Sequence, residues 1–160
     1  MMYKSFDEII EKVLEHEGGY VDDPSDSGGE TKYGISKKAY PDEDIKGLTV
    51  ERAKELYKRD YWDKFKVNEL PSSIRHIYVD MCINMGGRRA TKILQQSCNN
   101  KNNFDIDVDG YIGKNTIKAC KNLEVFRIRA YRVLFYAKLV QKTPSQEKFY
   151  VGWFRRSCEV

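Results

Sequence analysis

Residues 15–35 read EHEGGYVDDPSDSGGETKYGI, a run of carboxylates, glycines and hydroxyls with few apolar side chains to bury. The run follows a helical pattern that ends at Glu17, and regular apolar spacing resumes only at Ile35. Its Asp-Pro and Gly-Gly pairs are turn signals. A plain surface turn rarely needs this density of both acidic residues and glycine. We therefore interpret residues 15–35 as an active-site loop around which the rest of the chain is arranged.

A helix is predicted immediately before this loop, from Ser5 to Glu17. Ser5 and Glu8 have the spacing of a capping box at its start, and Gly18–Gly19 stops it. Five apolar residues recur there at helical spacing and form one stripe: Phe6, Ile9, Ile10, Val13 and Leu14. Glu17 therefore lies on the last turn of an amphipathic helix.

The position of Glu17 suggests general acid catalysis. Carbonyl groups place partial negative charge at the end of a helix, and Glu15 lies nearby. A carboxyl group there is expected to have a raised pKa, as a general acid working near neutral pH requires. The alternative is an ordinary solvated glutamate, which most residues at helix ends are.

The loop also holds candidates for a second catalytic group. Asp22, Asp23 and Asp26 lie in it, and Thr31 lies on the limb by which the chain returns. A helix-end Glu, a loop Asp and a Thr suit hydrolysis of a glycosidic bond. One acid protonates the leaving oxygen, while a carboxylate and a hydroxyl orient water or stabilise positive charge on the sugar. The aspartates could instead be plain turn residues.

The remaining elements are predicted to be helical, apart from a short strand or hairpin at residues 31–35. Apolar spacing marks helices or helical packing at residues 49–61, 73–84, 90–98, 117–123 and 125–140. Residues 125–140 are apolar on more than one face, so this helix is expected to be largely buried. Thr143 to Gln146 resembles a capping box with proline at the first helical position, which opens a terminal helix.

Composition limits the classes of function. The chain has 160 residues, enough for one domain or two small lobes, and a net charge of +4 without a dense basic run. Nucleic-acid binding is therefore not expected. The N-terminus, MMYKSFDEII, has no apolar signal core and no stretch reaches membrane-spanning length. We expect synthesis in the cytoplasm, with any action outside following release.

Cysteine and aspartate spacing predicts no resident metal. Cys82, Cys98, Cys120 and Cys158 form no metal or redox motif, and three of them are expected to be buried thiols. Asp105, Asp107 and Asp109 match the start of a calcium-binding EF-hand loop. The twelfth position is Thr116 instead of a bidentate acid. Tight calcium binding is not expected, and weak binding is the alternative to an Asp-Gly turn.

Several motifs together resemble glycoside hydrolase family 108, which consists largely of phage endolysins and related bacterial N-acetylmuramidases. They are EGGYV and DP in residues 17–24, GGETKYGI in 28–35, YKRDYWDKF in 57–65, Leu70-Pro71, and DMCINMGG in 80–87. The C-terminal part is similar to the small helical peptidoglycan-binding module often joined to that family. Its matching residues are Leu94-Gln95, Asp109-Gly110, Gly113, Thr116, Ala119, Arg129, Tyr131 and Gly152-Trp153.

The resemblance implies that Glu17 is the catalytic acid. The set Glu17, Asp26 and Thr31 is similar to the Glu/Asp/Thr triad of phage-type lysozymes, although the second gap is one residue shorter. Asp22 or Asp23 could therefore take the place of Asp26. Sugar-contacting residues are expected among the aromatic and amide side chains of the matching motifs, namely Tyr20, Tyr33, Tyr61, Trp62 and Asn84. Core packing is the alternative for the aromatic residues.

These features predict a mainly α, lysozyme-like α+β fold. A catalytic lobe with a short hairpin would span residues 1–86, and a helical peptidoglycan-binding-like lobe would span residues 87–160. The expected function is that of an endolysin-type N-acetylmuramidase that acts as a monomer on the glycan strand of peptidoglycan, with no cofactor and no membrane insertion. A lytic transglycosylase and a non-catalytic wall-binding or phage structural protein are the alternatives. The sequence leaves open the preferred peptidoglycan chemotype, the export route and the choice between an inverting and a retaining mechanism.

Overall fold

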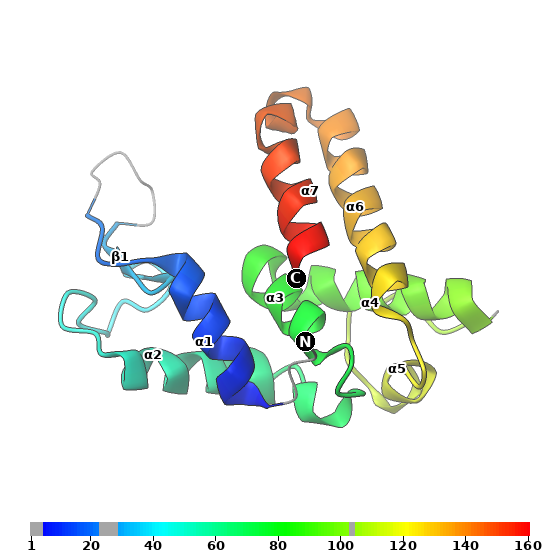
Figure 1. Cartoon of the computed structure of the whole chain (residues 1–160), viewed down its shortest axis with the longest axis horizontal. Helices are drawn as coiled ribbons and strands as arrows, with labels where there is room; N and C mark the ends of the chain where they lie inside the picture. The colour runs from blue at the N-terminus through cyan, green and yellow to red at the C-terminus, as the bar shows by residue number, and fades with distance from the viewer. Residues whose placement is uncertain (1–4, 23–28, 103–104) are drawn as a thin grey trace. The chain divides into compact units, whose positions relative to one another are not determined.

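The computed structural model describes residues 5–22, 29–102 and 105–160, which form two compact units (Figure 1). One unit consists of Ser5–Lys64, and the other contains Phe65–Val160. Helices dominate both units, and within the described residues the named strands pair as one short hairpin in the first unit. The predicted fold class, mainly α with a short hairpin and a helical C-terminal part, is confirmed.

The helix before the loop has the predicted ends. Helix α1 spans Phe6–Glu17 with Ser5 as its N-cap. The Ser5 hydroxyl accepts a hydrogen bond from the Glu8 amide at 3.3 Å, and the Glu8 carboxylate accepts one from the Ser5 amide at 3.0 Å. At the other end Gly18 has φ 69°, a backbone conformation that favours glycine. The capping box and the glycine stop together place Glu17 on the last turn.

The return limb forms the predicted hairpin. Strand β1 (Thr31–Lys32) pairs antiparallel with β2 (Ile35–Ser36) across a two-residue turn. Both turn residues have positive φ, 53° at Tyr33 and 76° at Gly34. This is the pattern of a type I′ turn, whose twist matches that of paired strands. Val21 also exchanges two 2.8 Å backbone hydrogen bonds with Thr31, which joins the two limbs of the loop.

The helix predicted from Thr49 changes character midway. Helix α2 spans Val50–Tyr57, and the Thr49 hydroxyl caps it by accepting from the Arg52 amide at 3.1 Å. It continues as a π-helical segment, η1, over Lys58–Asp63. The wider turn lets Lys58 pair with Asp63, five residues on, with Nζ and Oδ1 2.8 Å apart. The predicted helix is therefore present to Tyr61, but only its first part is α-helical.

The second unit is built from packed helices. After the short η2 (Val67–Glu69) come α3 (Arg75–Met85), α4 (Gly87–Asn102), α5 (Lys114–Ala119), α6 (Val125–Lys142), η3 (Pro144–Phe149) and α7 (Tyr150–Glu159). Helix α4 packs against α3, α5 and α6, while α6 and α7 run side by side and are joined through η3 (Figure 1). The buried apolar residues of the second unit come mainly from α3 and α4 and include Ile77, Tyr78, Met81, Cys82, Ala90, Ile93, Leu94 and Cys98.

Two details of the predicted C-terminal helices are wrong. Helix α6 is not largely buried, since Phe126 is 64% exposed and Leu134 is 42% exposed. Its buried residues are Ile128, Arg132 and Tyr136, which lie four residues apart on one face. Thr143 makes no side-chain cap, and a 3₁₀ segment precedes α7. Helix α6 is therefore covered on one face only, although its apolar residues occur on several faces.

The predicted burial of three cysteine thiols is confirmed. Cys82, Cys98 and Cys120 are buried, and Cys158 is exposed. Over residues 5–22, 29–102 and 105–160, the structure contains no helix with the length and apolar content needed to cross a membrane.

Candidate active site

Glu17 lies directly against the hairpin turn. A Cβ atom placed on Gly34 would be 3.1 Å from the Glu17 Cγ atom and 3.2 Å from its Oε2 atom. The Glu17 side chain is half-buried. The helix end therefore presents a carboxylate to the backbone of the turn that begins the return limb, and only a residue without a side chain fits beside it at position 34.

Tyr57 holds that turn in place. Its ring is buried on α2, and its hydroxyl donates a 2.8 Å hydrogen bond to the Tyr33 carbonyl. The same hydroxyl lies next to Gly34, where an added Cβ would overlap it. Three segments of the first unit thus meet at the Glu17 carboxylate, namely the end of α1, the hairpin turn and α2. The position of Tyr57 on the apolar stripe of α2 does not predict this role, because its partner Tyr33 lies 24 residues away in the sequence.

Thr31 and Tyr20 are placed by contacts between the two limbs of the loop. The Thr31 hydroxyl donates to the Gly29 carbonyl at 3.3 Å, which leaves its oxygen able to accept a further hydrogen bond. The Tyr20 hydroxyl donates to the Glu30 carboxylate at 2.8 Å. This hydrogen bond raises the pKa of Tyr20 to about 12, so the phenol keeps its proton over the neutral range. Glu30 was not singled out from the sequence.

The second carboxylate stays a prediction. Asp26 and the alternative Asp23 lie outside the described residues. Asp22 is described and exposed at the start of the loop. The geometry of the site therefore rests on Glu17, Thr31 and the hairpin turn.

The predicted sugar-contacting aromatic residues divide into accessible and buried ones. Tyr20 is 37% exposed, and Tyr33 and Tyr61 are half-buried in the same unit. Trp62 is only 1% exposed, and its ring packs edge-on against Phe6 with centroids 5.3 Å apart. A sugar cannot reach a ring in that position, so Trp62 belongs to the core and is removed from the candidate contacts.

Asn84 belongs to the other unit, near the end of α3. Its Oδ1 atom accepts from the Tyr136 hydroxyl and, at 3.4 Å, from Arg132 Nη2. One helical turn earlier, the buried Asp80 lies 2.8 Å from Arg132 and 2.8 Å from Arg156. Helices α3, α6 and α7 are therefore linked by charged and polar side chains. An arginine in the middle of the apolar pattern of α6 was the available sequence signal for this network.

The Asp-Gly segment after α4 is held by protein groups. Asp109 Oδ1 accepts from the Tyr111 amide at 2.9 Å and from the Gln95 amide group at 2.8 Å, and these bonds lower the pKa of the Asp109 carboxyl group. Asp105 and Asp107 are exposed. Among the residues that the structure describes, no three His, Cys, Asp or Glu side chains gather as a metal site. The contacts favour the Asp-Gly turn over the calcium loop.

Comparisons with known proteins agree with this architecture. Residues 10–86 match the family model described as glycosyl hydrolase 108, and residues 89–158 match one described as a predicted peptidoglycan domain. The structure of SagA from Brucella abortus is similar, with a TM-score of 0.77 and 28% sequence identity over 96% of this chain and 90% of that one. No protein with a curated description matches significantly.

The two family models meet between residues 86 and 89, whereas the compact units meet at Lys64 and Phe65. The difference arises because α3 lies in the hydrolase match but packs against α4. The predicted boundary between a catalytic and a binding lobe at residue 86 stays a prediction. Residues 10–86 thus form a glycosyl hydrolase 108 domain and residues 89–158 a predicted peptidoglycan domain, and the two together support a peptidoglycan hydrolase.

Proposed function

We propose that this chain is an N-acetylmuramidase that hydrolyses the bond following N-acetylmuramic acid in the glycan strand. The observation that carries the proposal is the position of Glu17, at the last turn of α1 and against the Gly34 turn. A general acid must be held within hydrogen-bond reach of the leaving oxygen. A carboxylate fixed between a helix end and a rigid turn meets the first requirement for that task.

In this mechanism Glu17 donates a proton to the glycosidic oxygen as the bond breaks. Asp26, or Asp22 or Asp23 in its place, acts with Thr31 to orient water and to offset the positive charge that develops on the sugar ring. The Thr31 hydroxyl is suited to accept from that water, because its own proton is donated to Gly29. We favour direct attack by water over a covalent glycosyl-enzyme.

The aromatic side chains of the first unit supply sugar contacts in the proposal. Tyr20, Tyr33 and Tyr61 offer flat faces with polar hydroxyls, which suit pyranose rings and their hydroxyl groups. The 2.8 Å hydrogen bond from the Tyr20 hydroxyl to the Glu30 carboxylate fixes the position of the Tyr20 ring. Tyr57 acts indirectly, since it holds the turn against which Glu17 lies.

The test compares two glutamates on the same helix end. Purified peptidoglycan is digested with wild type, Glu17→Gln and Glu15→Gln, and the released muropeptides are identified by mass spectrometry. Glu15 is exposed and pairs with Lys12 at 3.6 Å, so it is a matched control. Wild type is expected to release reducing N-acetylmuramic acid ends. Glu17→Gln is expected to lose about 10²–10⁴-fold in rate, and Glu15→Gln to stay near wild type.

Other outcomes assign other functions. Equal rates for Glu17→Gln and wild type would remove Glu17 from the mechanism. Anhydro ends instead of reducing ends would keep Glu17 and identify a lytic transglycosylase. Absence of cleavage by correctly folded wild type would leave a wall-binding protein. The variant Asp26→Asn further distinguishes a muramidase from a lytic transglycosylase, because a transglycosylase needs no second carboxylate.

A further inference from the structure

The second unit contains a pocket of about 500 Å³ between the end of α3 and the α6–α7 pair. Its lining combines aromatic rings, an amide and cationic side chains. Every residue that lines it belongs to Phe65–Val160. The catalytic proposal for Glu17 makes no use of this pocket.

One wall of the pocket is aromatic. Tyr136 of α6 and Trp153 of α7 stack with ring centroids 4.7 Å apart and an interplanar angle of 17°. Phe135 packs edge-on against Tyr136 at 5.4 Å. Tyr136 is buried, whereas Trp153 and Phe135 are partly exposed. The stacked pair gives the pocket a rigid aromatic wall, of which the partly exposed Trp153 is accessible to a peptide or a sugar ring.

Asn84 gives the pocket an oriented hydrogen-bond donor. Its Oδ1 atom receives the Tyr136 hydroxyl and Arg132 Nη2. Because arginine can only donate, the atom facing it must be the oxygen, and the amide orientation is thereby fixed. The NH₂ group of Asn84, a residue that lines the pocket, makes no hydrogen bond with any described residue. It is therefore free to donate to a ligand.

The electrostatic character of the pocket is positive. Arg89, Lys138 and Lys142 line it, no carboxylate does, and none of the three forms a salt bridge with a described residue. Behind Asn84, the carboxylate of Asp80 pairs with Arg132 and with Arg156. Arg132 is fully buried, and within the described residues its Nε and Nη1 atoms have no hydrogen-bond partner. The three cationic side chains of the lining therefore favour an anion.

We propose that this pocket binds the acidic stem peptide of peptidoglycan, with a peptide carboxylate on the Asn84 amide between Arg89, Lys138 and Lys142. The inference rests on the proposed peptidoglycan substrate. Along an intact strand the sugars are uncharged and the lactyl acid is amide-linked to the peptide, so the free carboxylates belong to the stem peptides. A carboxylate takes charge-assisted hydrogen bonds from such donors, and the accessible part of Trp153 contacts the peptide or the adjoining sugar. The C-terminal unit would thus hold the strand by its peptides.

The test measures binding without turnover. In the Glu17→Gln background, calorimetry compares a disaccharide that carries an L-Ala-γ-D-Glu-diaminopimelate peptide with the same disaccharide whose lactyl group ends in an uncharged amide. The peptide-bearing fragment is expected to bind about tenfold or more tightly, because charge-assisted bonds are added. Equal affinity for the two fragments would overturn the stem-peptide assignment. It would leave the muramidase proposal intact, since that proposal depends on cleavage products.

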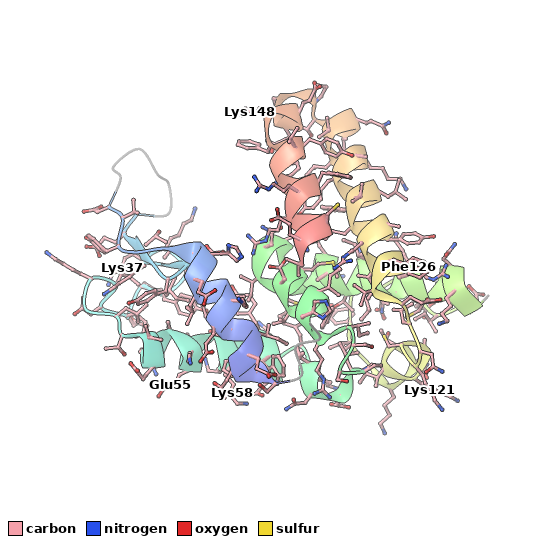
Figure 2. The ribbon with its side chains drawn as sticks, in the orientation of Figure 1. Lys37, Glu55, Lys58, Lys121, Phe126 and Lys148 are labelled. Carbon is pink, nitrogen blue, oxygen red and sulfur yellow. The ribbon has the colours of Figure 1, made fainter. Side chains whose placement is uncertain are left out.

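Asn84→Asp separates binding from folding. The new carboxylate can still accept from Tyr136 and Arg132, so the melting temperature is expected to stay near that of the parent. Affinity for the peptide-bearing fragment should fall about tenfold, because the donor becomes an anion. Lys121→Gln is the matched control, with the same change of net charge on the segment after α5, and should bind within about twofold of the parent (Figure 2).

A second variant keeps the proposal testable if Asn84→Asp fails to fold. Lys138 and Lys142 are exposed, so Lys138→Gln with Lys142→Gln leaves the core unchanged and should weaken binding about three- to tenfold. Unchanged affinity in this folded double variant would overturn the proposal. So would competition by anionic lipid vesicles or DNA as strong as that by the peptide-bearing fragment, because it would indicate a general anion-binding surface.

Discussion

The two units hold their polar groups in different ways. In Ser5–Lys64, backbone geometry positions the Glu17 carboxylate, since a positive-φ turn, a glycine and one tyrosine hydroxyl surround it. In Phe65–Val160, buried charge positions the Asn84 amide, since Arg132 and Asp80 lie directly behind it. The first arrangement should be sensitive to an added methyl group and the second to a removed charge. Figure 2 draws the described side chains of both units on the ribbon.

The largest expected effect is removal of the buried charge with Asp80→Asn. Asp80 neutralises Arg132, which has no solvent exposure. Breaking a buried pair on one side costs about 3–5 kcal/mol because the remaining charge stays buried. Urea unfolding should show this loss. Glu159→Gln, which breaks the exposed pair with Arg155, should cost under about 1 kcal/mol. Similar losses in both variants would show that burial of Arg132 does not control stability.

The next effect is an added methyl group in the first unit, Gly34→Ala. Gly34 has φ 76°, and its new Cβ would meet the Tyr57 hydroxyl and the Glu17 side chain. The left-handed conformation costs about 1–2 kcal/mol for a residue with a Cβ, and the overlap adds to it. We expect lower stability together with loss of cleavage. Gly152→Ala, in open space on α7, should be neutral or up to about 1 kcal/mol stabilising. Wild-type cleavage by Gly34→Ala would contradict the close approach of Glu17.

A smaller effect tests the tyrosine hydroxyl. Tyr57→Phe removes the hydrogen bond to the Tyr33 carbonyl and keeps the ring in the core. The unfolding free energy is expected to fall by about 1 kcal/mol. If the turn positions Glu17, kcat should also fall, and by more than the change in stability alone would produce. Tyr111→Phe is the control, since that ring is 64% exposed and its hydroxyl makes no hydrogen bond with a described residue. A variant with unchanged kcat would limit Tyr57 to packing.

The smallest effect concerns a partly exposed charge in the second unit. The hydrogen bond from Arg127 to Glu124, with Lys101 nearby, lowers the pKa of Glu124 to about 2. Because this pKa is lower in the folded state, the stabilisation is present above the unfolded value of about 4.3 and is lost as pH falls toward 2. Unfolding curves at pH 7 and pH 2.5 should show a smaller pH dependence in Glu124→Gln than in wild type. An identical pH dependence would mean that the pair forms equally well in the unfolded chain.

Local signals in the sequence predicted most of the elements. The Ser5–Glu8 capping box and Gly18 placed both ends of α1, and residues 31–35 were predicted to form a short strand or hairpin, because these segments depend on contacts a few positions away. Glu17 was placed on the last turn of α1 for the same reason. Long-range contacts could not be read in this way, among them the bond from Tyr57 to Tyr33 and the sharing of Asp80 by Arg132 and Arg156. Nothing in the apolar spacing of Trp62 distinguished a core ring from a sugar-binding one.

The π-helical segment η1 holds one more residue than an α-helix of the same span. Removing one residue from Lys58–Asp63 would restore an α-helical turn and leave the chain after the deletion in nearly the same orientation. A deletion within the α-helical part, Val50–Tyr57, would instead rotate everything after it by about 100° and turn Trp62 away from Phe6. It should therefore disrupt the unit more than a deletion in the exposed stretch Pro41–Asp42. Loss of one residue is expected to be tolerated within η1 and between the hairpin and α2, and excluded within α2.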